Sequence, residues 1–216
     1  MERYFILDKF NTWYDWRLIL TEKDITPPKP KTNYLNIDGA SGSLDLSEAL
    51  TGEITYNDCT LTASFWTDQG NRTDRERLLR DIKIALHGRK VKIVEPDDPD
   101  HYLLGRIAIS GVVNNLAYMT FKIEATCEPW RYALEEVTRT IDVKGQVNAI
   151  MNNHGVKSVS PEIEVDGRVV IEFNRNISTL ATGRYKIAEL KLRHGVNVIT
   201  LSGNGSVTFT YREADL

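Results

Sequence analysis

The sequence predicts a mainly β protein, with an α+β first domain that contains one helix and an all-β second domain. Several early segments alternate apolar and polar residues with a period of two, which is typical of half-buried antiparallel strands. One early segment instead has the apolar period of a helix. From about residue 134 onward, short strand-like runs recur between turn signals, without a helical period. We therefore expect two domains, residues 1–133 and 134–216.

The composition excludes several classes of protein. A hydrophobic content of 41% and a charged content of 26% are ordinary for a globular chain of 216 residues. The net charge of −3 gives no general attraction to nucleic acid or anionic membranes. No apolar run is long enough to span a bilayer, and the charged, aromatic N-terminus is unlike a secretory signal, so we expect synthesis in the cytoplasm. The two cysteines lack the spacing of a zinc site and are too few for a disulfide framework.

Two segments of the first domain are predicted strands with one apolar face each. They are "CTLTASF" at residues 59–65 and "MTFKIEATC" at residues 119–127. Cys59 and Cys127 fall on the apolar faces, so we expect buried side chains rather than reactive thiols.

The predicted helix is "TDRERLLRDIKIALHG", residues 73–88. Thr73 and Glu76 have the spacing of a capping box, and Gly88 is a typical helix stop. The apolar stripe comprises Leu78, Leu79, Ile82, Ala85 and Leu86. Basic residues at 75, 77, 80 and 83 alternate with acidic ones, which favours a solvated or subunit-contacting face over a nucleic-acid surface.

Irregular segments and turn signals divide the remaining strands. "TPPKPKTNY", residues 26–34, favours an extended arm or an edge strand. "DDPD", residues 97–100, and Asn114-Asn115 predict turns between strands. Beyond residue 134 we expect an all-β sandwich of short strands separated by turn signals at Asp166-Gly167, His194-Gly195 and Gly203-Asn204-Gly205. The predicted strands are residues 139–147, 161–167, 168–174, 185–195, 196–203 and 206–211.

"DGASGSLDLSEALTG", residues 38–52, is the stretch most similar to a functional loop. It fails as a hydrolase elbow because the glycine at 42 comes one residue too early for G-x-S-x-G. It lacks the lysine of a phosphate-binding loop, and the spacing of Asp38, Asp45 and Glu48 does not fit a calcium loop.

No other segment supplies a catalytic or metal-binding pattern. The four histidines, His87, His101, His154 and His194, are scattered without metal-ligand spacing, and "DDPDH" is an ordinary acidic turn. We therefore predict no enzymatic activity, no metal and no cofactor. Trp13, Tyr14, Trp16 and Trp66 could stack on sugars, anchor a subunit interface or fill the core, and the sequence leaves these alternatives open.

The order of these features resembles the distal tail protein (Dit) family of bacteriophages with long non-contractile tails. The similarity is strongest from Gly39 to Phe65, where a G-x-x-G-S-L-D-L-like segment precedes the strand "CTLTASF". It extends to the helix, to the hairpin "HGRKVKIVEPDDPDHYLLGRIAI" and to the C-terminal segment "LKLRHGVNVITLSGNGSVTFTYRE".

This resemblance implies a structural virion protein, located at the tail tip and assembled in the host cytoplasm. Its N-terminal domain would form a homo-hexameric ring between the tail-tube protein and the tail-associated or fibre protein. Its second domain would be galectin-like and would serve as a platform for receptor-binding proteins. Neither nucleic acid nor membrane is an expected partner. A carbohydrate-binding module that contacts host cell-wall glycans is the alternative function.

Within this interpretation residues 38–52 form an assembly joint. We expect Ser43, Leu44, Asp45, Leu46 and Glu48 to lie at the assembly interface. The leucines, including Leu50, would pack, the acidic residues would cap or pair with a neighbouring chain, and the glycines would shape the backbone. We accordingly predict that Asp45→Ala or Leu46→Asp impairs ring formation or folding.

Overall fold

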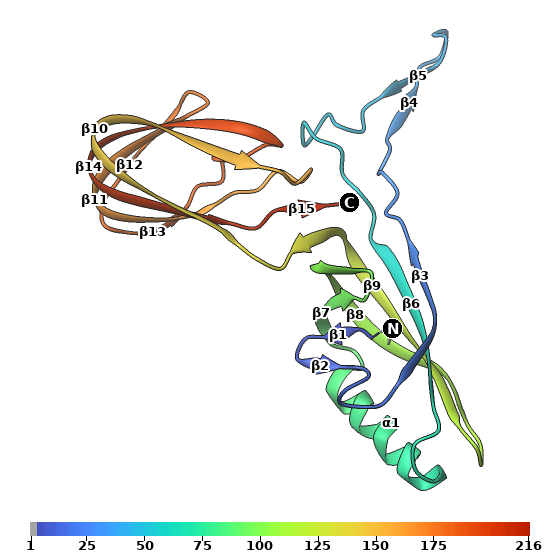
Figure 1. The fold of residues 1–216 in the computed structure, drawn as a ribbon. Helices are drawn as coiled ribbons and strands as arrows, with labels where there is room; N and C mark the ends of the chain where they lie inside the picture. Colours follow the sequence, from blue (N-terminus) through green and yellow to red (C-terminus); the bar gives the residue numbers. More distant parts are fainter. Residues whose placement is uncertain (1–3) are drawn as a thin grey trace. The chain divides into compact units, whose positions relative to one another are not determined.

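The computed structural model describes residues 4–216 and contains one helix and several antiparallel sheets (Figure 1). The predicted fold class, mainly β with one helix, is confirmed. The first three residues of the predicted N-terminal domain lie outside the described residues. Among residues 4–216, no helix is long and apolar enough to cross a membrane.

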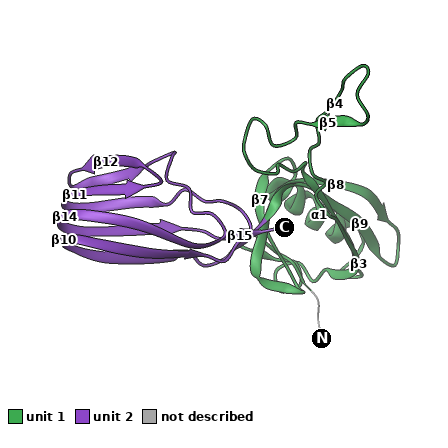
Figure 2. Ribbon diagram, turned by 90° about the horizontal axis from the view of Figure 1, so that it is seen from above, with its two compact units in different colours: residues 1–130, 216 green, residues 131–215 purple. Residues whose placement is uncertain are grey.

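The chain forms two compact units, one ending at Trp130 and joined by Leu216, the other Arg131–Asp215 (Figure 2). The predicted division between residues 133 and 134 lies close to this point. That each part is an independent domain stays a prediction.

Most of the first unit is built on an antiparallel sheet with the order β2-β1-β7-β8-β9-β6-β3. A last short strand, β15, pairs with the end of β9 at Arg131 and Tyr132, within the second unit. The strands are β1 (Ile6–Leu7), β2 (Phe10–Asn11), β3 (Ile19–Thr26), β6 (Cys59–Thr67), β7 (Lys90–Glu95), β8 (Asp98–Asn114), β9 (Met119–Ala133) and β15 (Ala214–Asp215).

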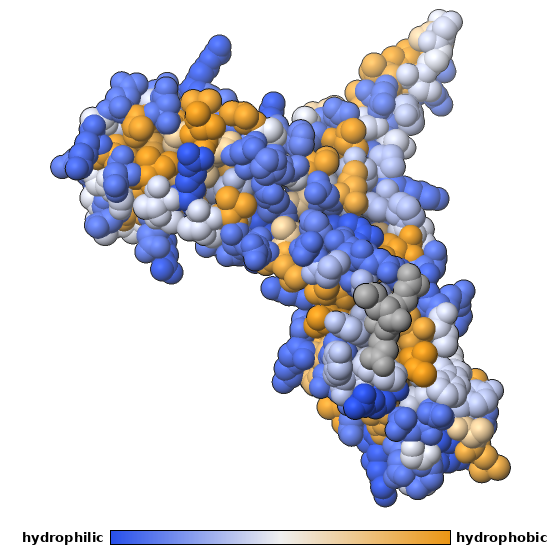
Figure 3. All heavy atoms as spheres, in the orientation of Figure 1, coloured by the Kyte–Doolittle hydropathy of each residue, from blue (hydrophilic) through white to orange (hydrophobic). Residues whose placement is uncertain are grey.

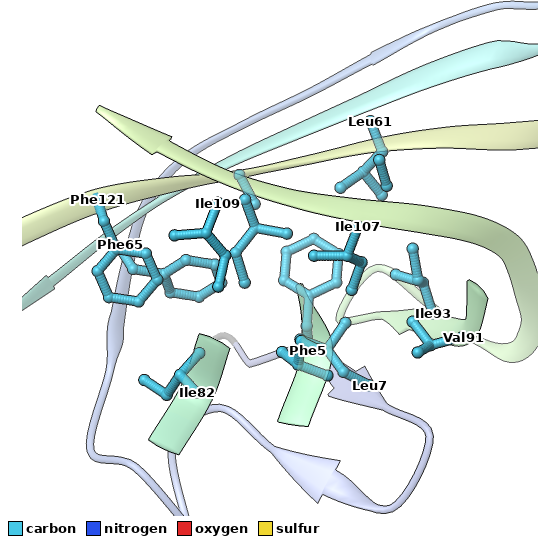
Figure 4. Close-up of a cluster of buried hydrophobic side chains, with 14 of the residues drawn as sticks. Phe5, Leu7, Leu61, Phe65, Ile82, Val91, Ile93, Ile107, Ile109 and Phe121 are labelled. Atoms are coloured by element: carbon cyan, nitrogen blue, oxygen red, sulfur yellow. The ribbon is translucent and has the colours of Figure 1, made fainter. Parts of the chain in front are cut away.

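The core of the first unit lies between one face of this sheet and helix α1 (Arg72–Leu86). Strand β6 buries every second residue, and so does β9 from Met119 to Cys127, as their sequence alternation predicted. Phe65 and Phe121 lie opposite each other in these strands, with ring centroids 5.8 Å apart. The close-up shows Ile82 of α1 on the side of the cluster opposite the long strands (Figure 4). Burial of large apolar side chains from both elements holds the helix on the sheet.

The helix cap differs from the prediction. The N-cap is Asn71, whose side-chain oxygen accepts hydrogen bonds from the amides of Thr73 at 2.8 Å and Asp74 at 3.1 Å. Asp74 completes the capping box by accepting from the Asn71 amide at 3.2 Å. The predicted Thr73–Glu76 box is therefore wrong, since the helix is capped two residues earlier, by Asn71 and Asp74. Gly88 follows the helix with a φ of +77°, which confirms the predicted stop.

The turn between β7 and β8 is also displaced from its predicted place. Glu95 pairs with Asp98, so the chain reverses at Pro96 and Asp97. Residues 98–100 of the predicted "DDPD" turn belong to β8 instead. The later turn after Asn114 is confirmed.

The second unit is a five-stranded antiparallel sheet with the order β10-β14-β11-β12 and with β13 also paired to β11. The buried residues of its long strands are odd-numbered and belong to one core. They come from both halves of each strand, for example Val143 and Met151 of β10 or Ile199 and Phe209 of β14. The strands are β10 (Val137–Asn153), β11 (Glu162–Phe173), β12 (Asn176–Leu180), β13 (Gly183–Lys186) and β14 (Gly195–Tyr211).

Glycines lie at the middle of the three long strands. Gly145 of β10 is opposite Gly203 of β14, and Gly167 of β11 is opposite Gly205 of β14. All four have positive φ, a conformation that lets the strands bend at this point. The bend lets the apolar residues before and after the glycines join one core. The all-β prediction is confirmed, but the predicted turns at Asp166-Gly167 and Gly203-Asn204-Gly205 are wrong because these glycines lie inside continuous strands. The predicted strand 185–195 ends at Lys186.

Candidate assembly surface

A long excursion between β3 and β6, residues 27–58, forms an extended arm of the first unit (Figure 1). The two sides of its stem pair with each other: the Lys31 amide donates to the Thr55 carbonyl at 2.8 Å, and the Asn57 amide donates to the Lys29 carbonyl at 2.9 Å. The prolines at 27, 28 and 30 cannot donate to a ladder, which keeps this segment out of a larger sheet. The arm predicted from "TPPKPKTNY" is present.

The end of the arm is a two-stranded hairpin of β4 (Tyr34–Asn36) and β5 (Ser43–Asp45). Leu35 and Leu44 are direct cross-strand partners, and the Leu46 amide extends the pairing by donating to the Asn33 carbonyl at 2.8 Å. Gly39 and Gly42 in the connecting loop have φ of +85° and +81°, conformations that other residues adopt at a cost.

Asp45 shapes the turn that follows β5. Its carboxylate accepts hydrogen bonds from the hydroxyl and, at 2.9 Å, from the amide of Ser47. These hydrogen bonds lower the pKa of the Asp45 carboxyl below its ordinary value. The Ser47 hydroxyl also accepts from the Asn33 amide at 2.9 Å, which ties the turn to the other side of the hairpin. Asp45 therefore caps a local turn, one of the two roles expected for it.

The leucines of this stretch do not pack as a group within the chain. Leu44 is 49% exposed and Leu50 is 98% exposed, whereas Leu46 is half-buried. Hydrophobic surface gathers on the arm near the hairpin (Figure 3). The other large apolar side chains of the arm with about half or more of their surface exposed are Tyr34, Leu35, Ile37 and Ile54. The structure thus brings Ser43, Leu44, Asp45, Leu46 and Glu48 together on one hairpin and its following turn. Their contact with another chain stays a prediction.

Arg75 is the structural residue that the sequence analysis missed. Predicted on a solvated or subunit-contacting face, it is 1% exposed. Its guanidinium donates to the Gly70 carbonyl at 2.7 Å, to the Asn115 and Leu116 carbonyls at 2.8 and 3.1 Å, and to Asn114 Oδ1 at 3.1 Å. Arg75 thereby fixes the tip of the β8–β9 hairpin to the start of α1. Its spacing from Leu79, Ile82 and Leu86 places it on the buried stripe, which is the signal that could have revealed it.

The histidines serve local contacts. His101 Nδ1 lies 2.8 Å from Asp98 Oδ1, and His87 Nδ1 accepts from the Ile109 amide at 3.0 Å. Among residues 4–216, no group of three or more His, Cys, Asp or Glu side chains has an arrangement that could hold a metal ion.

The aromatic residues whose role the sequence did not decide each contact a different neighbour. Trp16 stacks on Phe10 at 5.0 Å and packs against the first core, whereas Tyr14 is 62% exposed. Trp13 lies under the Arg17 guanidinium, and Trp66 lies 6.4 Å from the Tyr118 ring.

The second unit has a polar groove of about 460 Å³ on β11, β13 and β14. Arg184 and Glu164 lie 3.5 Å apart in it, and Tyr185 in its lining packs partly against the second core. None of the four tryptophans lines this groove. The tryptophans that a carbohydrate-binding module could use therefore do not line this groove, and sugar binding by the face of the second unit alone stays a prediction.

The chain is similar to known proteins in its fold but not detectably in its sequence. No protein-family model and no curated protein sequence matches the chain. The crystal structure of the Dit protein of phage SPP1, described as a paradigm of the hub of the adsorption apparatus in phages that infect Gram-positive bacteria, superposes with a TM-score of 0.67. The match covers 97% of this chain and 98% of SPP1 Dit at 14% identity.

The chain has the fold of a phage distal tail protein. The resemblance to Dit proteins that the sequence indicated is thus confirmed at the level of the fold. A component of the phage p2 baseplate in its activated conformation is also similar, with a TM-score of 0.41 and 8% identity over 97% of this chain and 98% of the other. The Dit fold extends through both units, because the match to SPP1 Dit covers nearly the whole chain.

Proposed function

We propose that this protein is a structural subunit of a phage tail tip. In this role it forms a hexameric ring that joins the tail tube to the tail-tip and receptor-binding proteins, and it catalyses no reaction. The first support is the likeness to SPP1 Dit over nearly the whole chain. The second is the arm, which has the properties of a segment that is completed by a neighbouring subunit.

The arm is the observation that carries the proposal. Its hairpin is a two-stranded sheet, and within residues 4–216 neither β4 nor β5 pairs with a third strand. Exposed backbone edges of this kind can pair with another chain. The apolar side chains of Tyr34, Leu35 and Leu44 accompany these edges and remain about half exposed in the single chain. Burial of such side chains against a neighbour would favour association by about 25 cal/mol for each Å² removed from water.

A ring closes when the same contact repeats around a rotation axis. One subunit then supplies the arm and the next supplies a different surface, which makes the interface heterologous. An arm at a fixed place in the fold meets this requirement, because each copy reaches the next in the same way. The second unit remains available to bind other tail-tip components in this arrangement.

The test is the assembly state of the full chain and its binding to tail components. Light scattering coupled to gel filtration over a range of concentrations should show a hexamer or concentration-dependent oligomers, and electron microscopy should show rings. Immobilised protein should also capture the tail-tube protein of the same phage. A chain that stays monomeric at high concentration and binds neither tail-tube nor tail-tip proteins would contradict the proposal.

A further inference from the structure

The only two cysteines of the sequence lie directly opposite each other in the sheet of the first unit. Cys59 is the first residue of β6, and its partner in the antiparallel register is Cys127 of β9. Both side chains are buried on the core face, with 2% and 0% of their surfaces exposed. The two residues are 68 positions apart in sequence, and the register alone brings them together.

This register satisfies the distance requirement of a disulfide. Directly opposed residues of an antiparallel pair have Cα atoms about 4.5 or about 5.5 Å apart, and disulfides span Cα separations of roughly 4.4 to 6.8 Å. The Cα separation therefore permits a bond, and Cys127 Sγ, which leans toward Gly105 of β8, would have to rotate toward β6 to form it. In the reduced protein the Cys59 thiol donates to the Glu128 carbonyl at 3.5 Å and the Cys127 thiol donates to the Ala125 carbonyl at 3.7 Å. A hydrogen bond with Cys59, together with burial, raises the pKa of the Cys127 thiol, which disfavours its thiolate.

The neighbouring strand β8 leaves room for the Cys127 sulfur atom. Gly105 of β8 faces Cys127, and a Cβ atom at Gly105 would stand 2.4 Å from Cys127 Sγ. A glycine at this point allows the Cys127 side chain to lie over β8 within the core.

A groove of about 630 Å³ on the first unit lies beside the pair. Its lining includes Cys127, whose side chain is itself buried, together with polar side chains. Lys90 and Glu128 form an ion pair there, and the Arg106 guanidinium donates to the Gly88 carbonyl at 2.6 Å. The lining includes both basic and acidic groups, so it suits a small zwitterionic peptide better than an apolar compound.

We propose that Cys59 and Cys127 are a modification site that closes to an intrachain disulfide in the presence of a small disulfide oxidant such as oxidised glutathione. The Cys59 thiol loses its proton, and its sulfur attacks the glutathione disulfide and releases the first reduced glutathione. The Cys127 thiol then loses its proton as its sulfur attacks the mixed disulfide, forms the Cys59–Cys127 bond and releases the second glutathione. The protein loses two protons and two electrons, and one oxidised glutathione becomes two reduced molecules.

Closure would fix the base of the arm. The stem of the arm ends at Asn57, and Cys59 follows it as the first residue of β6. A bond from Cys59 to Cys127 would therefore attach the returning side of the arm covalently to β9. This inference goes beyond the proposed assembly role and does not depend on it.

The experiment uses the full chain, purified with reductant and then transferred to buffer with oxidised glutathione. After denaturation with iodoacetamide, intact mass spectrometry should show the loss of two hydrogen atoms and no alkyl groups. Peptide mapping should find Cys59 joined to Cys127, and reduction should restore two thiols that can be alkylated. The thermal unfolding midpoint of the oxidised protein should exceed that of the reduced protein.

Matched controls keep the inference falsifiable. Cys59→Ser and Cys127→Ser should each fail to lose two hydrogen atoms under the same treatment. Two alkylated cysteines in the native chain, under conditions where the urea-unfolded chain closes, would overturn the proposal. Stable glutathione adducts or disulfide-linked dimers as the main products would also overturn it. The measurement on the unaltered chain decides the question even if a serine variant folds poorly.

Discussion

Gly205 of β14 lies directly opposite Gly167 of β11, and the approach of the two strands leaves no room for a side chain. A Cβ atom at Gly205 would stand 2.1 Å from the Asp166 carbonyl oxygen, and one at Gly167 would stand 2.5 Å from the Asn204 carbonyl oxygen. The clashing atoms are backbone, so a rotamer change cannot relieve them. The bend of the second sheet therefore depends on glycine at this place.

Gly205→Ala should destabilise the second unit by at least about 2 kcal/mol, because it adds a backbone clash to a strained φ of +149°. Urea unfolding of the full chain, followed by a probe of the second unit, measures the effect. Gly145→Ala is the matched control, since it also has a positive φ of +81° but meets no atom within 4 Å. It should cost about 1 to 2 kcal/mol. Equal effects of the two substitutions would show that the close approach does not matter.

These glycines also explain where the sequence prediction of the fold stopped. Alternation of apolar residues identified the strands, since a sheet with one buried face needs an apolar residue at every second position. A glycine between two such runs indicates a turn or a bend equally well. Gly167 and Gly203 keep the apolar residues in the same parity on both sides, and this unbroken parity is what distinguishes a bent strand from two strands.

Arg75→Met should destabilise the first unit by about 3 kcal/mol, because it leaves the Gly70, Asn115 and Leu116 carbonyls without their guanidinium donor. Urea unfolding measures the loss. Hydrogen exchange supplies a local measurement, since the Ala117 and Tyr118 amides, which donate to Asn115 Oδ1, should exchange faster in the variant.

Arg77→Met is the control for this substitution. Arg77 is on the same helix, but its side chain is 70% exposed and makes a surface ion pair with Asp74 at 3.3 Å. Its loss should change stability by less than about 1 kcal/mol. If both variants unfold like the unaltered chain, Arg75 does not hold the hairpin.

The turn after β5 gives a prediction about pH. The hydroxyl and amide of Ser47 lower the pKa of the Asp45 carboxyl below 3.8. The stabilisation of this turn is therefore fully present above pH 3.8 and is lost as the pH falls through the lower pKa of the folded hairpin. Ser47→Ala removes the stronger donor, so an NMR titration of the Asp45 carboxyl should show its pKa move up toward the ordinary value.

Ser43→Ala is the control for this titration. Its hydroxyl donates to Asn36 Oδ1 at 2.6 Å and is not a donor to Asp45. The Asp45 pKa should stay low in this variant. A pKa for Asp45 that is the same with and without the Ser47 hydroxyl would contradict the turn described here.

The candidate surface could be predicted only in part from the sequence. The glycines, prolines and serines of residues 26–52 indicated an irregular arm, because each restricts or frees the backbone in a known way. The exposure of Leu44 and Leu50 could not be predicted, since leucine in a short run is ordinarily assigned to a core. Arg75 was misplaced for the opposite reason, because arginine is ordinarily assigned to solvent.

Leu44→Asp should weaken assembly without unfolding the chain. Leu44 is 49% exposed, so a carboxylate there stays hydrated in the single chain and should change its stability by no more than about 1 kcal/mol. In an oligomer that covers the arm, the same carboxylate would be buried, and the dissociation constant should rise at least about tenfold. This position is a cleaner test than Leu46→Asp, because Leu46 is half-buried and its substitution also perturbs the hairpin.

Ile177→Asp supplies the comparison for assembly. Ile177 lies on β12 of the second unit and is 68% exposed, so the chemical change and the exposure are similar. Light scattering should show the oligomer of the unaltered chain retained in Ile177→Asp and reduced in Leu44→Asp, while circular dichroism and unfolding midpoints stay close for all three. Unchanged assembly of Leu44→Asp would mean that the interface lies elsewhere. Equal losses in both variants would mean that any exposed apolar residue contributes to assembly and that the arm has no special part in it.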